Sequence, residues 1–256
     1  MTDKLAVNIT VVCWNRLEAT KRLLNSIEKF PSGYPFELTL INNGSTDGTL
    51  DFFKSDLPDF VTRIIHIPEN VGIAKAYNLG WRLGCKEYYM KLDNDMTFLK
   101  VGWLKHLIEM VKGIPKVGAV AYNVEPNNYP VKKFGGITAQ VKQGNLGGCT
   151  MLLPKDTWDK LGYWYEGFGL YGGVDGEYGN RILYAGLLNC YSTDKSMVRH
   201  FSTAEENECL IMAEKVCIQY GLVRKGAFEK RKKEYVTRLK VSSGGNCEHQ
   251  ILRSRV

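Results

Sequence analysis

The segment Glu87-Tyr88-Tyr89-Met90-Lys91-Leu92 runs directly into Asp93-Asn94-Asp95, so a short apolar run ends in three polar residues. The apolar run predicts a buried β-strand, and the apolar residues of 96–107 settle into helical spacing. Two carboxylates one residue apart at the end of such a strand can both face one divalent cation. Oxygen-rich sites of this kind suit Mg²⁺ or Mn²⁺ that bridges to the phosphates of a substrate. The alternative is that these residues only cap the helix that follows.

Strands and helices alternate along the whole N-terminal half. Residues 7–14, 36–41 and 61–67 are apolar and β-branched, which predicts strands, and residues 17–27 and 72–83 carry apolar residues at helical spacing. This alternation predicts a three-layer α/β sandwich of Rossmann-like type, with a mostly parallel central sheet. Ligands of such sheets bind at the carboxyl ends of the strands, where the strand order reverses. Four polar residues fall at such ends: Asn15, Asn42, Asn43 and Asp93.

The pattern changes after residue 117. Residues 126–148 are rich in Pro, Gly and Asn, and residues 162–173 form a loop rich in glycine and aromatic residues. A helix is expected from Val174-Asp175 onward, and an amphipathic helix over residues 205–220. We find no internal repeat and no flexible linker. The sequence therefore predicts one domain over residues 1–222, followed by a helical, basic C-terminal tail over residues 223–256.

The tail carries the whole excess of positive charge. The chain has a net charge of +7, and residues 224–256 hold ten basic and three acidic side chains, a difference of +7. Two interpretations stay open: a solvated, partly helical tail, or a contact with an anionic membrane surface or an acidic partner. No nucleic-acid-binding motif is present, and charge alone does not indicate nucleic acid as a partner.

Cysteine usage and hydropathy indicate a compartment. The seven cysteines are scattered and include no C-x-x-C pair, which is typical of reduced cysteines in a cytosolic protein. No apolar run has the ~18 residues that a transmembrane helix needs. The first six residues lack the layout of a signal peptide. We therefore expect a cytoplasmic protein, with peripheral membrane contact through the tail as the variant to test.

Five segments, in this order, resemble the family 2 glycosyltransferases of the GT-A fold over residues 5–203. They are Cys13-Trp14-Asn15-Arg16, Leu40-Ile41-Asn42-Asn43-Gly44-Ser45-Thr46-Asp47-Gly48-Thr49, Glu69–Gly80, Leu92-Asp93-Asn94-Asp95 and Val174-Asp175-Gly176-Glu177-Tyr178-Gly179-Asn180-Arg181. The resemblance implies an inverting enzyme that uses a nucleotide-diphosphate sugar. It also implies which residues contact the nucleotide: Trp14, Asn15, Asn42, Asn70, Asn78, Asp93 and Asn94.

The same resemblance implies a metal site and a base. Asp93 and Asp95 would hold the metal, and His200 stands where family members often place a further ligand, which favours Mn²⁺ over Mg²⁺. Asp175 matches the general base that takes a proton from the acceptor hydroxyl. For His200 the alternative is an ordinary histidine at a strand end. For Asp175 it is a helix N-cap.

Two departures from the family pattern bear on specificity. Asn42 stands where the family usually has Asp, and an amide fits the edge of uracil better than that of guanine, which favours a UDP-sugar. Val174 replaces the first acid of the family's pair, which affects the positioning of the acceptor. The aromatic residues of the 162–173 loop are either a platform for sugar rings or ordinary core: Trp164, Tyr165, Phe168 and Tyr171.

The expected reaction is therefore sugar transfer from a nucleotide sugar to a glycan or glycoconjugate hydroxyl, as in polysaccharide biosynthesis. A lipid-phosphate or lipid-linked acceptor at the membrane is an alternative that the basic tail would favour. A nucleotidyltransferase is another, but residues 13–17 contain no glycine to hold a triphosphate. A relative without catalytic activity is the alternative outside enzymes, and the acidic residues and His200 argue against it.

Overall fold

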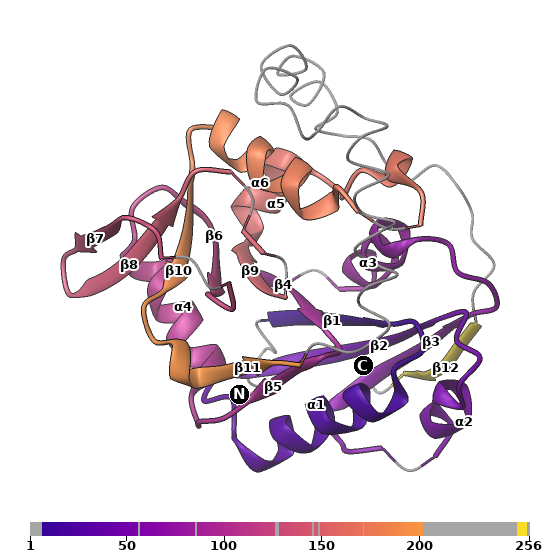
Figure 1. Ribbon diagram of the computed structural model, residues 1–256. Helices are drawn as coiled ribbons and strands as arrows, with labels where there is room; N and C mark the ends of the chain where they lie inside the picture. Colours follow the sequence, from indigo (N-terminus) through magenta and orange to yellow (C-terminus); the bar gives the residue numbers. More distant parts are fainter. Residues whose placement is uncertain are drawn as a thin grey trace.

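The computed structural model describes residues 7–55, 57–84, 86–125, 128–144, 146–147, 149–170, 172–201 and 250–254 (Figure 1). Its strands are β1 (Val7–Cys13), β2 (Phe36–Asn43), β3 (Val61–Ile67), β4 (Tyr88–Asp93), β5 (Met96–Phe98), β6 (Val117–Tyr122), β7 (Val131–Phe134), β8 (Ile137–Lys142), β9 (Thr150–Pro154), β10 (Leu188–Ser192), β11 (Val198–His200) and β12 (Gln250–Ser254). Its α-helices are α1 (Leu17–Lys29), α2 (Thr49–Phe53), α3 (Ile73–Arg82), α4 (Trp103–Gly113), α5 (Lys155–Leu161) and α6 (Val174–Tyr184). Two 3-10 turns, Glu166–Phe168 and Lys195–Met197, complete the described elements.

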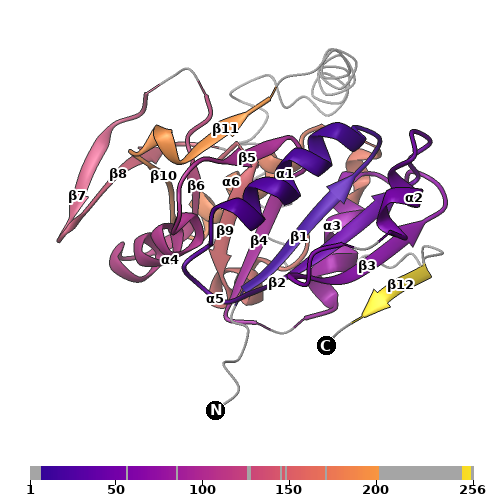
Figure 2. The same ribbon diagram turned by 90° about the horizontal axis from the view of Figure 1, so that it is seen from below.

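One large sheet forms the middle layer. Its order is β12-β3-β2-β1-β4-β9-β6-β10-β8-β7, and β5 pairs separately with β11 in a short ribbon. The pairings of β1 with β2, β2 with β3, β1 with β4 and β6 with β10 are parallel. The chain moves outward from β1 to β3 and then returns to place β4 on the other side of β1, as Figure 2 shows. The strand order therefore reverses between β1 and β4.

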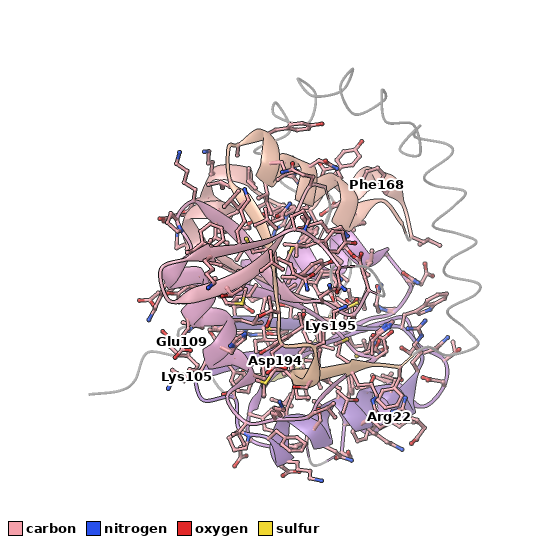
Figure 3. All side chains as sticks on the ribbon, turned by 60° about the vertical axis from the view of Figure 1, so that its left-hand side comes forward. Arg22, Lys105, Glu109, Phe168, Asp194 and Lys195 are labelled. Atoms are coloured by element: carbon pink, nitrogen blue, oxygen red, sulfur yellow. The ribbon has the colours of Figure 1, made fainter. Side chains whose placement is uncertain are left out.

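Helices cover both faces of this sheet, as the sequence predicted. Alternate residues of β1 (Val7, Ile9 and Val11) face a core shared with α1 and α4, while α3, α5 and α6 pack on the opposite face. The charged side of α4, with Lys105 and Glu109, points to solvent (Figure 3). The three-layer α/β sandwich is confirmed.

The side chains on the other face of β1 point toward α3, which approaches the strand very closely. A Cβ atom on Gly80 would lie 2.5 Å from the side chain of Thr10, so only glycine fits at this point of the helix. The neighbouring Asn8 side chain donates a hydrogen bond to the Gly80 carbonyl at 3.2 Å. These contacts fix α3 against β1 and so position the start of α3 near the carboxyl end of the strand.

The second half of the sheet adds antiparallel strands to the parallel ones. The sheet is parallel from β3 to β4, but β9 runs antiparallel to both β4 and β6, and β8 and β7 add antiparallel pairs. The β7–β8 pair is joined as a hairpin, which can only place strands antiparallel. The predicted mostly parallel sheet is therefore confirmed as a parallel half, in which strand and helix alternate, joined to a mixed half.

The C-terminal tail is described only at residues 250–254. These five residues form β12, an edge strand antiparallel to β3, whereas the sequence suggested helix. The amphipathic helix expected over 205–220 and all the basic residues of the tail except Arg253 lie outside the described residues. Among the residues that the structure describes, no helix is long and apolar enough to span a membrane.

Candidate active site

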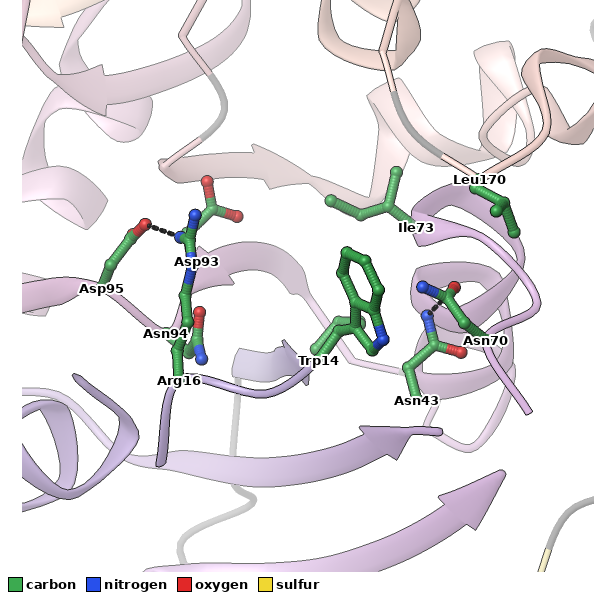
Figure 4. Close-up of a pocket in the computed structure, with 10 residues that line it drawn as sticks. Trp14, Arg16, Asn43, Asn70, Ile73, Asp93, Asn94, Asp95 and Leu170 are labelled. Atoms are coloured by element: carbon green, nitrogen blue, oxygen red, sulfur yellow. Dashed lines mark hydrogen bonds and ion pairs between the residues drawn. The ribbon is translucent and has the colours of Figure 1, made fainter. Parts of the chain in front are cut away.

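A pocket opens at the carboxyl ends of β1 and β4, where the strand order reverses (Figure 4). This is the position at which open α/β sheets bind ligands. Its lining comes from the strand ends, the start of α3 and the loop before α6: Val12, Trp14, Arg16, Asn43, Asn70, Ile73, Asp93, Asn94, Asp95 and Leu170. Four of the predicted nucleotide contacts line it: Trp14, Asn70, Asp93 and Asn94.

The loop after β1 presents an aromatic ring and a guanidinium to this pocket. Trp14 is 37 % exposed, although tryptophan is usually buried. Asn15 and Arg16 both have left-handed backbone, with φ of 57° and 63°. The Asn15 side chain accepts a hydrogen bond from the Thr46 N–H at 2.8 Å, which ties this loop to the one after β2. Asn15 thus holds the turn that directs Arg16 into the pocket, and it does not line the pocket itself.

The two asparagines that end β2 have different surroundings. Asn43 lines the pocket and donates to the Asn70 side-chain oxygen at 3.0 Å. Asn42 is fully buried. Its Oδ1 accepts a hydrogen bond from the Ser45 N–H at 3.0 Å, and its Nδ2 lies 3.0 Å from Nδ1 of His66. Successive side chains of a strand point to opposite faces, so only one of the pair can reach the pocket. That residue is Asn43, which was not among the predicted nucleotide contacts.

Asn78 also lies away from the pocket. It is fully buried in α3, and its amide donates to the Trp164 carbonyl at 2.9 Å and to Glu166 at 2.8 Å. Its oxygen accepts from the Trp164 N–H at 2.9 Å. The side chain therefore anchors the loop after α5, and the structure does not bring it to the other predicted nucleotide contacts.

The aromatic loop contributes mainly to the core. Trp164 and Phe168 are 1 % and 4 % exposed, and Trp164 packs against Trp81 with ring centroids 5.3 Å apart. Tyr165 is partly buried and meets Phe168 edge to face. Tyr171 lies outside the described residues. For Trp164 and Phe168 the structure therefore supports the core interpretation and not the sugar platform.

Asp93 is held by a buried lysine from its own strand. Lys91 is 1 % exposed and its ammonium lies 2.6 Å from Oδ1 of Asp93. The hydroxyl of Tyr77 donates to the same oxygen at 3.0 Å. Lys91 also lies 3.7 Å from Oδ1 of Asp175, which comes from the first turn of α6. One buried cation thus joins the predicted donor carboxylate to the predicted base.

These contacts fix the charge state of the pair. Burial opposes ionisation of Asp93, but Lys91 and the hydrogen bonds from Lys91 and Tyr77 hold the pKa of this carboxyl below its ordinary value. Burial alone would lower the pKa of Lys91, yet the charges of Asp175 and Asp93 raise it well above its ordinary value. At neutral pH the site therefore contains a charged Lys91 beside an ionised Asp93.

Asp95 meets two side chains from distant parts of the chain. Nη1 of Arg16 lies 2.6 Å from its Oδ2, and Nε2 of His200 lies 3.4 Å from the same oxygen. The β5–β11 ribbon brings His200 to this position by pairing it with Met96. Asp95 Oδ1 is buried and has no hydrogen-bond partner within the described part of the chain. Asn94, between the two acids, instead donates to the Thr20 hydroxyl at 3.0 Å.

The donor set around Asp95 fits a divalent cation. The described residues hold no group of three or more His, Cys, Asp or Glu side chains arranged around a common point. Metals such as Mg²⁺ often bind through only one or two carboxylates together with the phosphates of a substrate. The buried Asp95 oxygen and the neighbouring His200 imidazole satisfy this smaller requirement, whereas Asp93 is turned toward Lys91.

Asp175 is not the N-cap of its helix. The N-cap of α6 is Gly173, and Asp175 is the second residue of the first turn. Glu177, the other acid of this turn, is fully buried and paired with Arg181 at 2.8 Å. Arg181 also donates to the Leu161 carbonyl at 2.6 Å and thereby fixes the loop before α6. Of the two acids, only Asp175 therefore lies next to the Lys91–Asp93 pair.

Comparison with known proteins identifies the relatives of this arrangement. Residues 8–160 match the family model described as "Glycosyl transferase family 2". A poly-beta-1,6-N-acetyl-D-glucosamine synthase of Staphylococcus epidermidis is 26 % identical over 174 residues, which are 62 % of this chain and 42 % of the relative. The corresponding synthase of Staphylococcus aureus strain COL is 29 % identical over 145 residues, or 56 % of this chain and 34 % of the relative. The chain thus matches less than half the length of these curated relatives.

Solved structures show the same fold. A mannosyltransferase of Pyrobaculum calidifontis in complex with GDP-Man and Mn²⁺ superposes with a TM-score of 0.63 at 18 % identity, covering 93 % of this chain and 70 % of that one. GalNAc-T7 with UDP, GalNAc and Mn²⁺ superposes with a TM-score of 0.62 at 15 % identity, covering 78 % of this chain and 44 % of that one. Because the family model spans more than half of its residues, the chain belongs to glycosyl transferase family 2. It is a glycosyltransferase of the GT-A fold, which excludes the nucleotidyltransferase alternative.

Proposed function

We propose that this family 2 glycosyltransferase moves a sugar from a UDP-sugar to a carbohydrate hydroxyl, with inversion at the anomeric carbon. One observation carries the proposal: Lys91 pairs with Asp93 at 2.6 Å and lies 3.7 Å from Asp175. A carboxylate suited to the donor and a carboxylate suited to the acceptor therefore share one buried cation. This arrangement supports a single site in which both substrates meet.

The donor's base would lie between Trp14 and the two asparagines of the pocket wall. The exposed indole of Trp14 offers a flat apolar surface for stacking. The amides of Asn43 and Asn70 carry N–H groups that can donate to the carbonyl oxygens of uracil. The sequence suggested that Asn42 selects uracil. Because Asn43 and Asn70 line the pocket instead, we assign the recognition of uracil to these two residues.

Asp95 and His200 would hold a divalent cation, Mn²⁺ in preference to Mg²⁺, with Asp93 as the next carboxylate. When bound, such a cation supplies Lewis-acid stabilisation of the charge on the departing diphosphate, worth several kcal/mol. Lys91 would meanwhile keep Asp93 ionised and oriented by their 2.6 Å contact. The protein's own contribution is thus to position oxygen ligands in a largely buried site.

Asp175 would act as the general base. It takes the proton of the acceptor hydroxyl as the hydroxyl oxygen attacks the anomeric carbon and the bond to the diphosphate breaks. Attack from the face opposite the leaving group inverts the anomeric centre in one step. A sugar hydroxyl is a poor nucleophile near neutral pH, and positioned proton transfer contributes ~10²–10⁴-fold in rate.

The acceptor is proposed to be a glycan chain. The curated relatives carry the name poly-beta-1,6-N-acetyl-D-glucosamine synthase, which supports a polysaccharide product. N-acetylglucosamine is therefore the first sugar to test as donor and as acceptor. A screen of UDP- and GDP-sugars with Mn²⁺, scored by release of nucleoside diphosphate with and without short glycans, measures this directly. Release from GDP-sugars alone would contradict the UDP assignment.

The decisive variant is Asp175→Asn. If Asp175 is the base, nucleotide binding stays nearly unchanged because the carboxylate serves the acceptor, while transfer falls by ~10²–10⁴-fold. Binding is measured by calorimetric titration of UDP and transfer by product formation. The exposed Asp51→Asn variant on α2 is the control. A kcat within threefold of the parent enzyme would exclude Asp175 as the base.

A further inference from the structure

Arg16 has a charged side chain in the pocket, and the proposed reaction assigns no role to it. Its guanidinium lies 2.6 Å from Oδ2 of Asp95, and its side chain is only 13 % exposed. The left-handed turn at Asn15 and Arg16 directs it there, and the Asn15–Thr46 hydrogen bond holds that turn. The backbone conformation of this loop therefore fixes the position of Arg16.

This ion pair occupies one of the two oxygens of the carboxylate that a metal would need. Nε2 of His200 reaches the same Oδ2 at 3.4 Å, so an ion held by His200 and either oxygen of Asp95 would lie close to the guanidinium. Two cations on one carboxylate repel each other, and the repulsion is larger in a buried site than in water. Arg16 and a divalent cation therefore compete for Asp95.

A displaced Arg16 remains beside the pocket. It lines the same pocket as Trp14, Asn70 and Asp93, and Figure 4 shows it beside Asp95, with Trp14, Asn43 and Asn70 toward the other side of the pocket. A guanidinium presents paired N–H donors that match phosphate oxygens, and such charged hydrogen bonds are stronger than neutral ones. When Arg16 leaves Asp95, it could therefore pair with a diphosphate that spans the pocket.

We propose that Arg16 is an exchanging residue: it neutralises Asp95 before ligands bind and transfers to the donor's diphosphate when a divalent cation takes its place. This inference rests on the proposed function, because it needs a nucleotide-diphosphate donor. The exchange predicts opposite effects of Arg16 on the affinity for the metal and on the affinity for the nucleotide. Arg16 weakens the binding of the metal alone and strengthens the binding of the nucleotide.

The test uses Arg16→Met, which removes the charge and keeps an unbranched side chain, and Arg16→Lys, which keeps the charge. The control is Arg22→Met on α1. Arg22, labelled in Figure 3, is exposed, and its guanidinium packs on the ring of Phe201 and not on Asp95. Mn²⁺ affinity without nucleotide is measured by electron paramagnetic resonance, and UDP affinity at saturating Mn²⁺ by calorimetry. Urea unfolding verifies that each variant is folded.

We expect Arg16→Met to bind Mn²⁺ more tightly and, with Mn²⁺ at saturation, to bind UDP about tenfold more weakly, the size of one lost charged hydrogen bond. Arg16→Lys should fall between Arg16→Met and the parent. Loss of both affinities together would show a merely structural role, and two unchanged affinities would also overturn the inference. If the parent protein binds neither UDP nor GDP with Mn²⁺, the proposed function itself fails.

Discussion

Lys91 is a charged residue in the middle of a buried strand, and its partners explain its place. It shares a face of β4 with Tyr89 and Asp93, because residues two apart in a strand point the same way. That face packs against α3, α5 and α6, so a lysine there needs a carboxylate partner. A lysine inside an apolar run is therefore itself a sign of a buried ion pair, although residues 87–92 predicted only a strand.

Replacing Lys91 with Met should destabilise the protein, since it leaves the carboxylate of Asp93 without its cation. Loss of one partner of a buried pair costs about 3 kcal/mol. The lowered pKa of Asp93 means that its contribution to stability exists above the ordinary value of 3.8 and is lost as the pH falls through the lower folded value. The raised pKa of Lys91 keeps its contribution fully present below the ordinary value of 10.5, and that contribution is lost only as the pH rises through the higher folded value.

Urea unfolding from about pH 7 down to about pH 3 measures this difference, because the window spans the titration of carboxylates. The gap between Lys91→Met and the parent should be largest near neutral pH and should narrow in acid, where Asp93 becomes protonated. The exposed Lys29→Met variant on α1 is the control and should change little. A gap that stays constant with pH would show that Lys91 contributes packing and not charge.

Asp95→Ala should remove the metal-dependent part of nucleotide binding. Asp95 offers a buried oxygen without a hydrogen-bond partner in the described part of the chain, and His200 lies beside it. Calorimetric titration of UDP with and without Mn²⁺ separates the two parts. Asp51→Ala, whose carboxylate is exposed, should keep the full effect of Mn²⁺. Unchanged stimulation by Mn²⁺ in Asp95→Ala would refute the metal assignment.

Residue type and position in the sequence indicate which residues stand at strand ends, but not which of them line the pocket. Asp93 and Asp95 follow a buried strand, so their place at the sheet edge follows from the strand itself. Asn42 and Asn78 have the same residue type as true pocket residues but are fully buried. Which of two adjacent asparagines faces the pocket depends on strand alternation and loop contacts, which residue type does not specify.

At the scale of elements, the ribbon of β5 and β11 is a feature that local sequence patterns do not predict. Residues 96–98 and 198–200 lie about a hundred positions apart in the chain, yet their pairing places His200 beside Asp95. The apolar pattern predicted strand β4 and helix α6 because these signals are local. The pairing of two three-residue strands carries no comparable local signal.

Glu125 forms a second network that joins three elements of the mixed half of the sheet. It follows β6 and accepts from Lys142 of β8 at 2.5 Å and from the Tyr191 hydroxyl of β10 at 2.7 Å. Burial would raise its pKa, but the hydrogen bonds from Lys142, Tyr129 and Tyr191 hold the pKa of this carboxyl below its ordinary value of 4.5. Its contribution to stability is therefore present above pH 4.5 and is lost as the pH falls through the lower folded value.

Glu125→Gln should accordingly lower the free energy of unfolding by about 1.5–3 kcal/mol near neutral pH, the size of a lost hydrogen bond to a charged group. The difference from the parent should shrink below pH 4.5, where the unfolded carboxyl is protonated. Glu109→Gln on the exposed side of α4 is the control, because its contact with Lys105 is a surface pair (Figure 3). Equal effects of the two variants in urea unfolding would contradict a role for this network.

At the scale of the whole molecule, the site lies between the two halves of the sheet. Trp14, Asn43 and Asp93 come from the parallel half, whereas Asp175 begins α6, which packs on β6 and β10 of the mixed half. Lys91 connects the two through its contacts with Asp93 and Asp175. The alternation of strands and helices in the sequence predicted the fold class. The position of the site at the junction of the two halves could not be predicted without the order of the strands in the sheet.

Ligand binding should therefore stabilise both halves together. UDP with Mn²⁺ at about 100 times the dissociation constant should raise the free energy of unfolding by about 2.7 kcal/mol, the mass-action value for a ligand that binds only the folded state. Circular dichroism reports the sheet and helices, and tryptophan fluorescence reports the buried Trp81, Trp103 and Trp164. Both signals should shift as one transition, because the Lys91 contacts cross the junction. Two transitions, of which only one responds to UDP and Mn²⁺, would show that the halves unfold separately and that the nucleotide contacts only one of them.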